Sequence, residues 1–124
     1  LVGNEALISR ARRWRKMLGG GMRQAGVLAA AAEYALRHHV GRLDEDHQHA
    51  QRLAEGLGDM GATLASPVQT NMVLLELEPE RVAALVEHAA RADVRISSPR
   101  LVTHLDVSAD DVDQVLAALS GFNW

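Results

Sequence analysis

Apolar residues recur at helical spacing through the first half of the chain. This spacing predicts a helix over residues 5–16, directly after Asn4, a residue type that favours helix N-caps. Three consecutive glycines at 19–21 are too costly for a helix interior and end it. The pattern then predicts an alanine-rich second helix over 22–39 and a polar, well-charged third helix over 43–57.

The second half changes to shorter apolar runs of strand character. The pattern predicts four strands, over residues 62–65, 71–77, 94–97 and 101–105, of which the second is expected to be buried. It also predicts two helices, one over 81–92 and one that Ser108 caps, with Asp111 adding negative charge to its first turn. This order is typical of a small α+β sandwich, a mainly antiparallel sheet with helices on one face.

Composition excludes several classes of protein. The 124 residues are 48 % hydrophobic and 23 % charged, which is the composition of a globular domain and not of a disordered tail or a fibre. The longest apolar run, over 27–32, is far too short to cross a membrane. The absence of cysteine excludes disulfides, zinc–thiolate sites and a cysteine nucleophile, and it suits a reducing cytoplasm.

Charge is distributed unevenly along the chain. Residues 1–23 carry a balance of +5, whereas the remainder carries −8. The cluster Arg12–Lys16, which includes Trp14 as a stacking platform, therefore leaves one alternative open: a small nucleic-acid-binding or interaction module. The acidic remainder would repel a polyanion, so the charge of the whole chain does not favour this function.

Lys16 and Arg23 flank the three glycines, and this arrangement suits a phosphate. Glycines ahead of a helix start are expected to expose backbone N–H groups, and the helix dipole adds partial positive charge. One phosphate could then be held by both cations. The alternative is a flexible hinge with a solvated basic face, and the run lacks the Gly-Lys-Ser/Thr ending of a Walker loop.

Arg100 directly precedes the strand predicted over 101–105, and in an extended conformation Arg100, Val102 and His104 share one face. An arginine fixed at the start of a strand, beside proline and apolar neighbours, can hold a carboxylate with a two-pronged contact. The alternative is a surface arginine that pairs with Asp106 or another acid. The six histidines do not show the spacing of a helical zinc pair, so no metal site is expected.

Two segments together carry a resemblance to a known family. Residues 13–26 (Arg-Trp-Arg-Lys-Met-Leu-Gly-Gly-Gly-Met-Arg-Gln-Ala-Gly) closely resemble a signature stretch of the low-specificity L-threonine aldolases, and residues 100–108 (Arg-Leu-Val-Thr-His-Leu-Asp-Val-Ser) resemble the C-terminal motif of that family. Between them, residues 45–47 and 69–72 also fit. The resemblance covers essentially all 124 residues, in the right order and spacing.

The resemblance implies a pyridoxal-phosphate enzyme of the aspartate-aminotransferase-like α/β fold, of which this chain is an α+β part. Its reaction would be the cleavage of L-threonine or L-allo-threonine to glycine and acetaldehyde. Residues 1–45 would be the C-terminal helices of the large cofactor-binding domain, and residues 46–124 the small domain. We expect a cytoplasmic homo-oligomer, a dimer or tetramer, that binds a small amino acid and neither nucleic acid nor membrane.

The family pattern also assigns roles to individual residues. Lys16 and Arg23 would lie near the cofactor phosphate, and Arg100 would grip the substrate α-carboxylate. The Schiff-base lysine would lie in a Ser-Lys-Gly-Leu-Gly-like segment upstream of Leu1, so no catalytic residue is expected in this chain, and the chain alone is expected to be inactive. Residues 1–40 are expected to expose apolar surface when separated from the rest of the parent protein.

Overall fold

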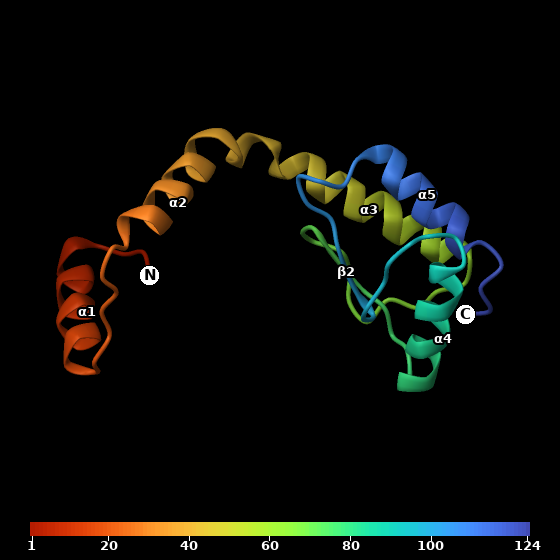
Figure 1. Ribbon diagram of the computed structural model, residues 1–124, viewed down its shortest axis with the longest axis horizontal. Coiled ribbons are helices and arrows are strands. Elements are labelled where there is room, and N and C mark those ends of the chain that lie inside the picture. Colours follow the sequence, from red (N-terminus) through yellow and green to blue (C-terminus); the bar gives the residue numbers. More distant parts are fainter. The chain divides into compact units, whose positions relative to one another are not determined.

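The computed structural model describes all 124 residues, and they form two compact units, residues 1–38 and residues 39–124. Each unit is described by itself (Figure 1). The assignment of residues 1–45 to a large domain and residues 46–124 to a small domain concerns a longer protein and stays a prediction. No helix combines the length and the apolar character that a membrane span requires.

Unit 1, residues 1–38, consists of α1 (Glu5–Met17) and α2 (Gly26–His38). The Asn4 side-chain Oδ1 accepts a 2.9 Å hydrogen bond from the backbone N–H of Leu7, so the predicted cap is confirmed. Neither helix contains a buried residue. Most apolar side chains of this unit are exposed, as the sequence predicts, whereas Ile8 and Ala11 are partly buried.

The predicted start of the second helix at residue 22 is wrong. Gln24 adopts a left-handed backbone conformation with φ +52°, which a right-handed helix cannot include. Residues 23–25 therefore form a turn, and the first hydrogen bond of α2 runs from the Ala29 N–H to the Ala25 carbonyl at 2.9 Å.

Unit 2, residues 39–124, contains the remaining elements. They are the 3₁₀ helix η1 (Val40–Arg42), α3 (Leu43–Asp59), β1 (Met72–Leu74), α4 (Pro79–Ala90), β2 (Arg100–Val102) and α5 (Ala109–Leu119). Strands β1 and β2 are antiparallel, with Met72 opposite Val102. Helices α3 and α5 lie side by side, and α3 also contacts β1 (Figure 1). The predicted α+β class is confirmed.

The strands are fewer and shorter than predicted. Residues 62–65 contribute one bridge, between Leu64 and Leu75, and residues 94–97 form no strand. Asp93 has φ +58°, and Val94 donates its N–H to the Ala89 carbonyl at 3.1 Å, so this amide closes the end of α4 and cannot join a ladder. The strand predicted over 71–77 is buried on one face only.

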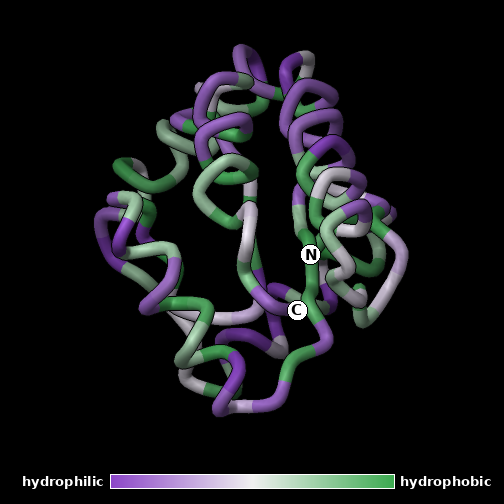
Figure 2. The backbone as a smooth tube through the Cα atoms, turned by 90° about the vertical axis from the view of Figure 1, so that its right-hand side faces the viewer, coloured by the Kyte–Doolittle hydropathy of each residue, from purple (hydrophilic) through white to green (hydrophobic).

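The hydrophobic core lies entirely in unit 2. The core has eleven buried apolar residues, of which ten come from three helices and the inner face of the sheet and one, Ile96, from a loop. They are Ala50, Leu53, Ala54, Leu57, Val73, Leu75, Leu85, Ala89, Ile96, Val112 and Leu119. Figure 2 shows apolar and polar stretches alternating along the chain, as amphipathic elements require. Ser108 and Asp111 form the capping box of α5, which confirms the predicted start of this helix.

Candidate functional site

The two residues predicted to hold a phosphate line one hollow in unit 1. This cationic hollow measures about 500 Å³, and its lining consists of Arg15, Lys16, Gly19, Gly20, Gly21, Met22, Arg23 and Ala25. Lys16 belongs to the last turn of α1, and Arg23 to the turn that precedes α2. The ammonium of Lys16 lies 4.0 Å from the point where a Cβ would stand on Gly21, beside the glycine loop, residues 19–21.

Two of the three loop positions require glycine. Gly19 has φ +78°, a conformation that side chains disfavour. A Cβ on Gly20 would lie 2.8 Å from the backbone oxygen of Arg15. The glycine run therefore does more than end α1, because it folds the chain tightly back against the last turn of that helix.

One feature of the predicted phosphate site is wrong. The N–H groups of Gly19 and Gly20 do not point outward, because they donate to the carbonyls of Lys16 at 3.1 Å and Arg15 at 2.7 Å. The glycine loop also does not form the N-terminus of α2, which begins only at Gly26. The positive charge that this hollow offers to an anion therefore comes from its cationic side chains.

Those side chains carry no counter-charge from within the chain. None of Arg15, Lys16 and Arg23 takes part in an ion pair. Two guanidinium groups and one ammonium around a single hollow suit a ligand with several anionic oxygens, such as a phosphate monoester.

Arg100 opens β2 in unit 2 and belongs to the solvent-facing side of the sheet. Burial alternates along this strand: Arg100, Val102 and His104 are exposed, Leu101 is partly buried and Thr103 is 3 % exposed. The predicted sharing of one face is therefore confirmed. The opposite strand adds Met72 and Leu74, which are also exposed, so the guanidinium belongs to a largely apolar sheet face.

The alternative partner for Arg100 is not observed. Arg100 forms no ion pair within the chain, and Asp106 instead lies 3.8 Å from His104. The strand beneath Arg100 is held at its start by Ser98, whose Oγ lies 3.3 Å from the Arg100 N–H and 3.2 Å from the Arg100 carbonyl oxygen. A fixed backbone and an unpaired guanidinium are what a carboxylate site needs.

A buried polar cluster connects the far end of β2 to the rest of unit 2. The hydroxyl of Thr103 donates to the backbone carbonyl of Asp46 at 2.6 Å, and Asn71 donates its side-chain amide to the Thr103 carbonyl at 2.7 Å. The sequence patterns did not predict these contacts. The first contact joins residues that are 57 positions apart in the sequence and the second joins residues 32 positions apart, so no local spacing reveals them.

An ion pair fixes the Asp46 end of this cluster. The Arg42 guanidinium donates to both carboxylate oxygens of Asp46, at 2.8 and 3.0 Å, and the Asp46 side chain is only 5 % exposed. These hydrogen bonds raise the pKa of Arg42 above its ordinary value, against the opposing effect of desolvation. The i, i+4 spacing of Arg42 and Asp46 was the one signal in the sequence that pointed to this pair.

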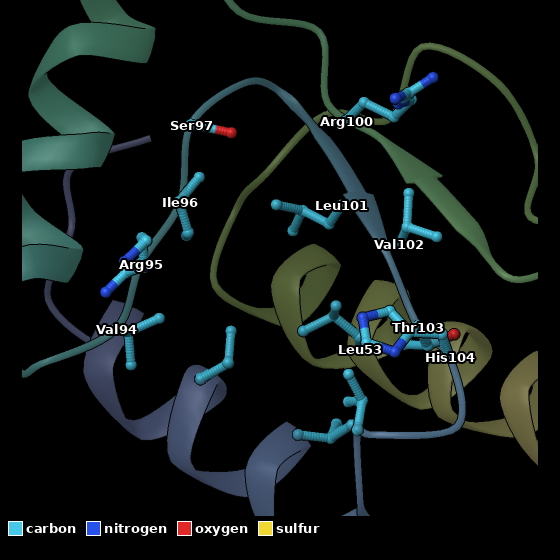
Figure 3. Close-up of a pocket in the computed structure, with 13 residues that line it drawn as sticks. Leu53, Val94, Arg95, Ile96, Ser97, Arg100, Leu101, Val102, Thr103 and His104 are labelled. Atoms are coloured by element: carbon cyan, nitrogen blue, oxygen red, sulfur yellow. The ribbon is translucent and has the colours of Figure 1, made fainter.

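A cavity of about 290 Å³ lies behind β2, between the strand and residues 94–97. Figure 3 shows Leu101 and Ile96 on its two sides, while Arg100 points away from Leu101. The side chains from α3 and α5 that complete its lining are aliphatic: Leu53, Val112 and Val115. The lining thus combines the apolar interior of unit 2 with Arg100, Val102 and His104 from the exposed face of β2.

Comparison with known proteins identifies relatives of the whole chain. The family model for beta-eliminating lyases matches residues 1–80. Two proteins named low specificity L-threonine aldolase, from Escherichia coli O157:H7 and Escherichia coli K12, are each 50 % identical to 98 % of this chain, which covers 37 % of their own length. A probable low-specificity L-threonine aldolase of Schizosaccharomyces pombe is 36 % identical over 91 % of the chain and 30 % of its own length.

These relatives confirm the resemblance noted in the sequence. The chain spans about a third of the length of the curated relatives it matches. None of the three is named as a nucleic-acid-binding protein, so the alternative function of the Arg12–Lys16 cluster gains no support from them.

Proposed function

Since the chain belongs to the beta-eliminating lyase family, we propose that it is part of a pyridoxal-phosphate-dependent aldolase. The reaction proposed is the cleavage of L-threonine or L-allo-threonine to glycine and acetaldehyde. The observation that carries this proposal is the 50 % identity, over 98 % of the chain, to proteins named low specificity L-threonine aldolase.

The residues of the cationic hollow fit the phosphate of the implied cofactor. Lys16 and Arg23 would hold it, and their freedom from ion pairs supports this role. When bound, pyridoxal phosphate supplies an electron sink for the bond that breaks at the amino-acid Cα. The contribution of Lys16 and Arg23 is charge neutralisation and retention, because a phosphate carries nearly two negative charges at neutral pH.

Arg100 would bind the α-carboxylate of the substrate. A guanidinium donates two parallel hydrogen bonds to a carboxylate, which fixes the orientation of the amino acid as well as its position. Orientation matters here because the scissile Cα–Cβ bond would react fast only when it is held parallel to the π orbitals that accept its electrons. The apolar face around Arg100 would strengthen the pair once a ligand excludes water.

The proposal includes a homo-oligomeric parent protein, a dimer or a tetramer, in the cytoplasm. The oligomer is supported by the exposed apolar surface of unit 1, which includes Val27, Leu28 and Leu36 of α2 at 77 %, 59 % and 72 % exposure. Surfaces of this kind are normally covered in the functional protein, by other parts of the same polypeptide or by a second subunit.

The test compares two arginine variants of the full-length protein, each titrated with cofactor and with glycine. Arg100→Ala should retain cofactor and weaken glycine binding about 30-fold or more, because a desolvated charge pair is worth about 2 kcal/mol or more. Arg100→Lys should recover part of the loss, because an ammonium cannot make the two-point contact. Arg23→Ala should weaken cofactor retention more than glycine affinity.

Two exposed arginines outside the proposed site serve as matched controls. Arg91→Ala, also in unit 2, controls for Arg100, and Arg10→Ala controls for Arg23; both should bind cofactor and glycine like the parent. If Arg100→Ala binds glycine like the parent, the carboxylate assignment is wrong. If Arg23→Ala retains cofactor unchanged, the phosphate assignment is wrong.

A further inference from the structure

Thr103 is the most enclosed polar residue next to the face that carries Arg100. Its side chain belongs to the inner side of the sheet, and the residue is 3 % exposed. Its hydroxyl donates to the Asp46 carbonyl oxygen at 2.6 Å, and its only other acceptor nearby, the Asn71 carbonyl oxygen, is at 3.4 Å. A buried hydroxyl is costly unless it is bonded, so this contact is a strong constraint on where β2 lies relative to α3.

Asn71 holds the same point from the neighbouring strand. Asn71 stands opposite Thr103, one position beyond the Met72–Val102 pair. The Thr103 N–H donates to the Asn71 carbonyl at 3.0 Å, and the Asn71 side-chain amide donates to the Thr103 carbonyl at 2.7 Å. A side chain thus completes the ladder at the position where β2 ends, so both backbone groups of Thr103 are fixed.

The α3 end of this contact is equally well held. Asp46 lies in the first turn of α3, and its carboxylate accepts two hydrogen bonds from Arg42. The Asp46 carbonyl that accepts the hydrogen bond from the Thr103 hydroxyl therefore lies in a helix turn that the bidentate Arg42–Asp46 ion pair holds in place. Strand β2 is tied at its start by Ser98 and beyond its end by Thr103, and the segment between these ties carries Arg100.

We propose that Thr103 is a positioning residue for Arg100: its buried hydroxyl fixes β2 on α3 and so sets the point from which the guanidinium reaches its ligand. This inference rests on the proposed function of Arg100 as the carboxylate-binding residue. A three-residue strand with one neighbour is weakly held by its own ladder, so the tie at Thr103 decides its position. A displacement of the reacting groups by about 1 Å is enough to impair catalysis.

The experiment separates the hydroxyl of Thr103 from its bulk in the full-length protein loaded with pyridoxal phosphate. Thr103→Val keeps the shape and removes the donor, whereas Thr103→Ser keeps the donor and removes the methyl group. Equilibrium glycine affinity should fall about tenfold in the valine variant, since a 1 Å displacement can cost up to 100-fold. The serine variant should bind glycine like the parent, and cofactor retention should be unchanged in both variants.

Two further measurements link the effect to Arg100. Methylamine, which has no carboxylate, should bind the valine variant as tightly as it binds the parent. In an Arg100→Ala background, adding Thr103→Val should change glycine affinity by less than about twofold, because the two residues act through one contact. A purely structural role would lower methylamine affinity as well and would remain visible in that background.

The outcomes distinguish this inference from the proposal on which it rests. If Arg100→Ala binds glycine like the parent, the proposed function of Arg100 fails. If Arg100→Ala loses glycine affinity but Thr103→Val does not, or if the serine variant is as weak as the valine variant, the positioning role is wrong. Should Thr103→Val not fold, Asn71→Ala decides in its place: it removes one tie to Thr103 and must weaken glycine more than methylamine.

Discussion

Replacing Leu57 by alanine tests whether the two units are energetically separate. Leu57 lies on α3 and is 0 % exposed, so truncation removes three buried carbons. The lost transfer free energy is about 2.5 kcal/mol at roughly 0.8 kcal/mol per carbon. The cavity that remains adds to it, and we expect a loss of about 3–4 kcal/mol. For a unit of 86 residues with a total stability of roughly 4–13 kcal/mol, this is a large fraction.

Leu36 provides the matched control in unit 1. It lies on α2 and is 72 % exposed, so the same truncation removes little buried surface. Alanine is also a slightly better helix former than leucine. We expect Leu36→Ala to change the stability of unit 2 by less than about 0.5 kcal/mol.

Urea unfolding followed by tryptophan fluorescence measures both variants. The chain has two tryptophans, so a Trp14→Phe background leaves Trp124, which contacts Phe122 at a ring distance of 4.9 Å, as a reporter of unit 2 alone. Leu57→Ala should lower the unfolding midpoint by about 2 M, and Leu36→Ala should leave it unchanged. Equal shifts in the two variants would refute the separation into two units, and no shift in Leu57→Ala would remove Leu57 from the core.

Two further predictions concern local structure. Ser108→Ala should destabilise unit 2 by about 1 kcal/mol at neutral pH through loss of the α5 cap, measured by urea unfolding. Hydrogen bonds from Ser108 lower the pKa of the Asp111 carboxyl. Their stabilisation is therefore present above the ordinary carboxyl pKa and is lost as pH falls through the lowered value. The difference in stability between parent and variant should shrink on acidification, and a difference that grows would contradict this. Gly20→Ala should strain the glycine loop by about 1–3 kcal/mol and weaken cofactor retention in the full-length protein. Gly21→Ala should retain cofactor like the parent, because its Cβ would meet only the Lys16 ammonium, at 4.0 Å. Equal retention by both variants would show that the loop does not shape the phosphate site.

Helix starts with side-chain caps could be predicted from the sequence. Asn4 caps α1, and the Ser108–Asp111 box caps α5, and in both cases the signal lies within three residues. The start of α2 has no such signal. It depends on the left-handed conformation of Gln24, which follows from how the loop folds back on α1 and not from local preference.

Strand lengths could not be predicted in the same way. Apolar character is the same for a paired strand and for an extended segment that packs against a core. Ile96 is buried without a ladder, and the Val94 amide is used at the end of α4. The face of Arg100 could be predicted because alternation is a local property, whereas the Thr103–Asp46 contact joins elements 57 residues apart.

The residues proposed for the site rest on scaffolds of different stability. Lys16 lies in the last turn of α1 and Arg23 in the turn before α2, and these two 13-residue helices bury nothing within unit 1. Helices of this length are marginal in water without tertiary packing. Arg100 instead stands on a sheet that covers a hydrophobic core and is tied at both ends. The geometry of Lys16 and Arg23, the residues proposed to bind phosphate, is therefore expected to depend on contacts that α1 and α2 make outside unit 1. The backbone position of Arg100, the residue proposed to bind the carboxylate, is already determined by unit 2 itself.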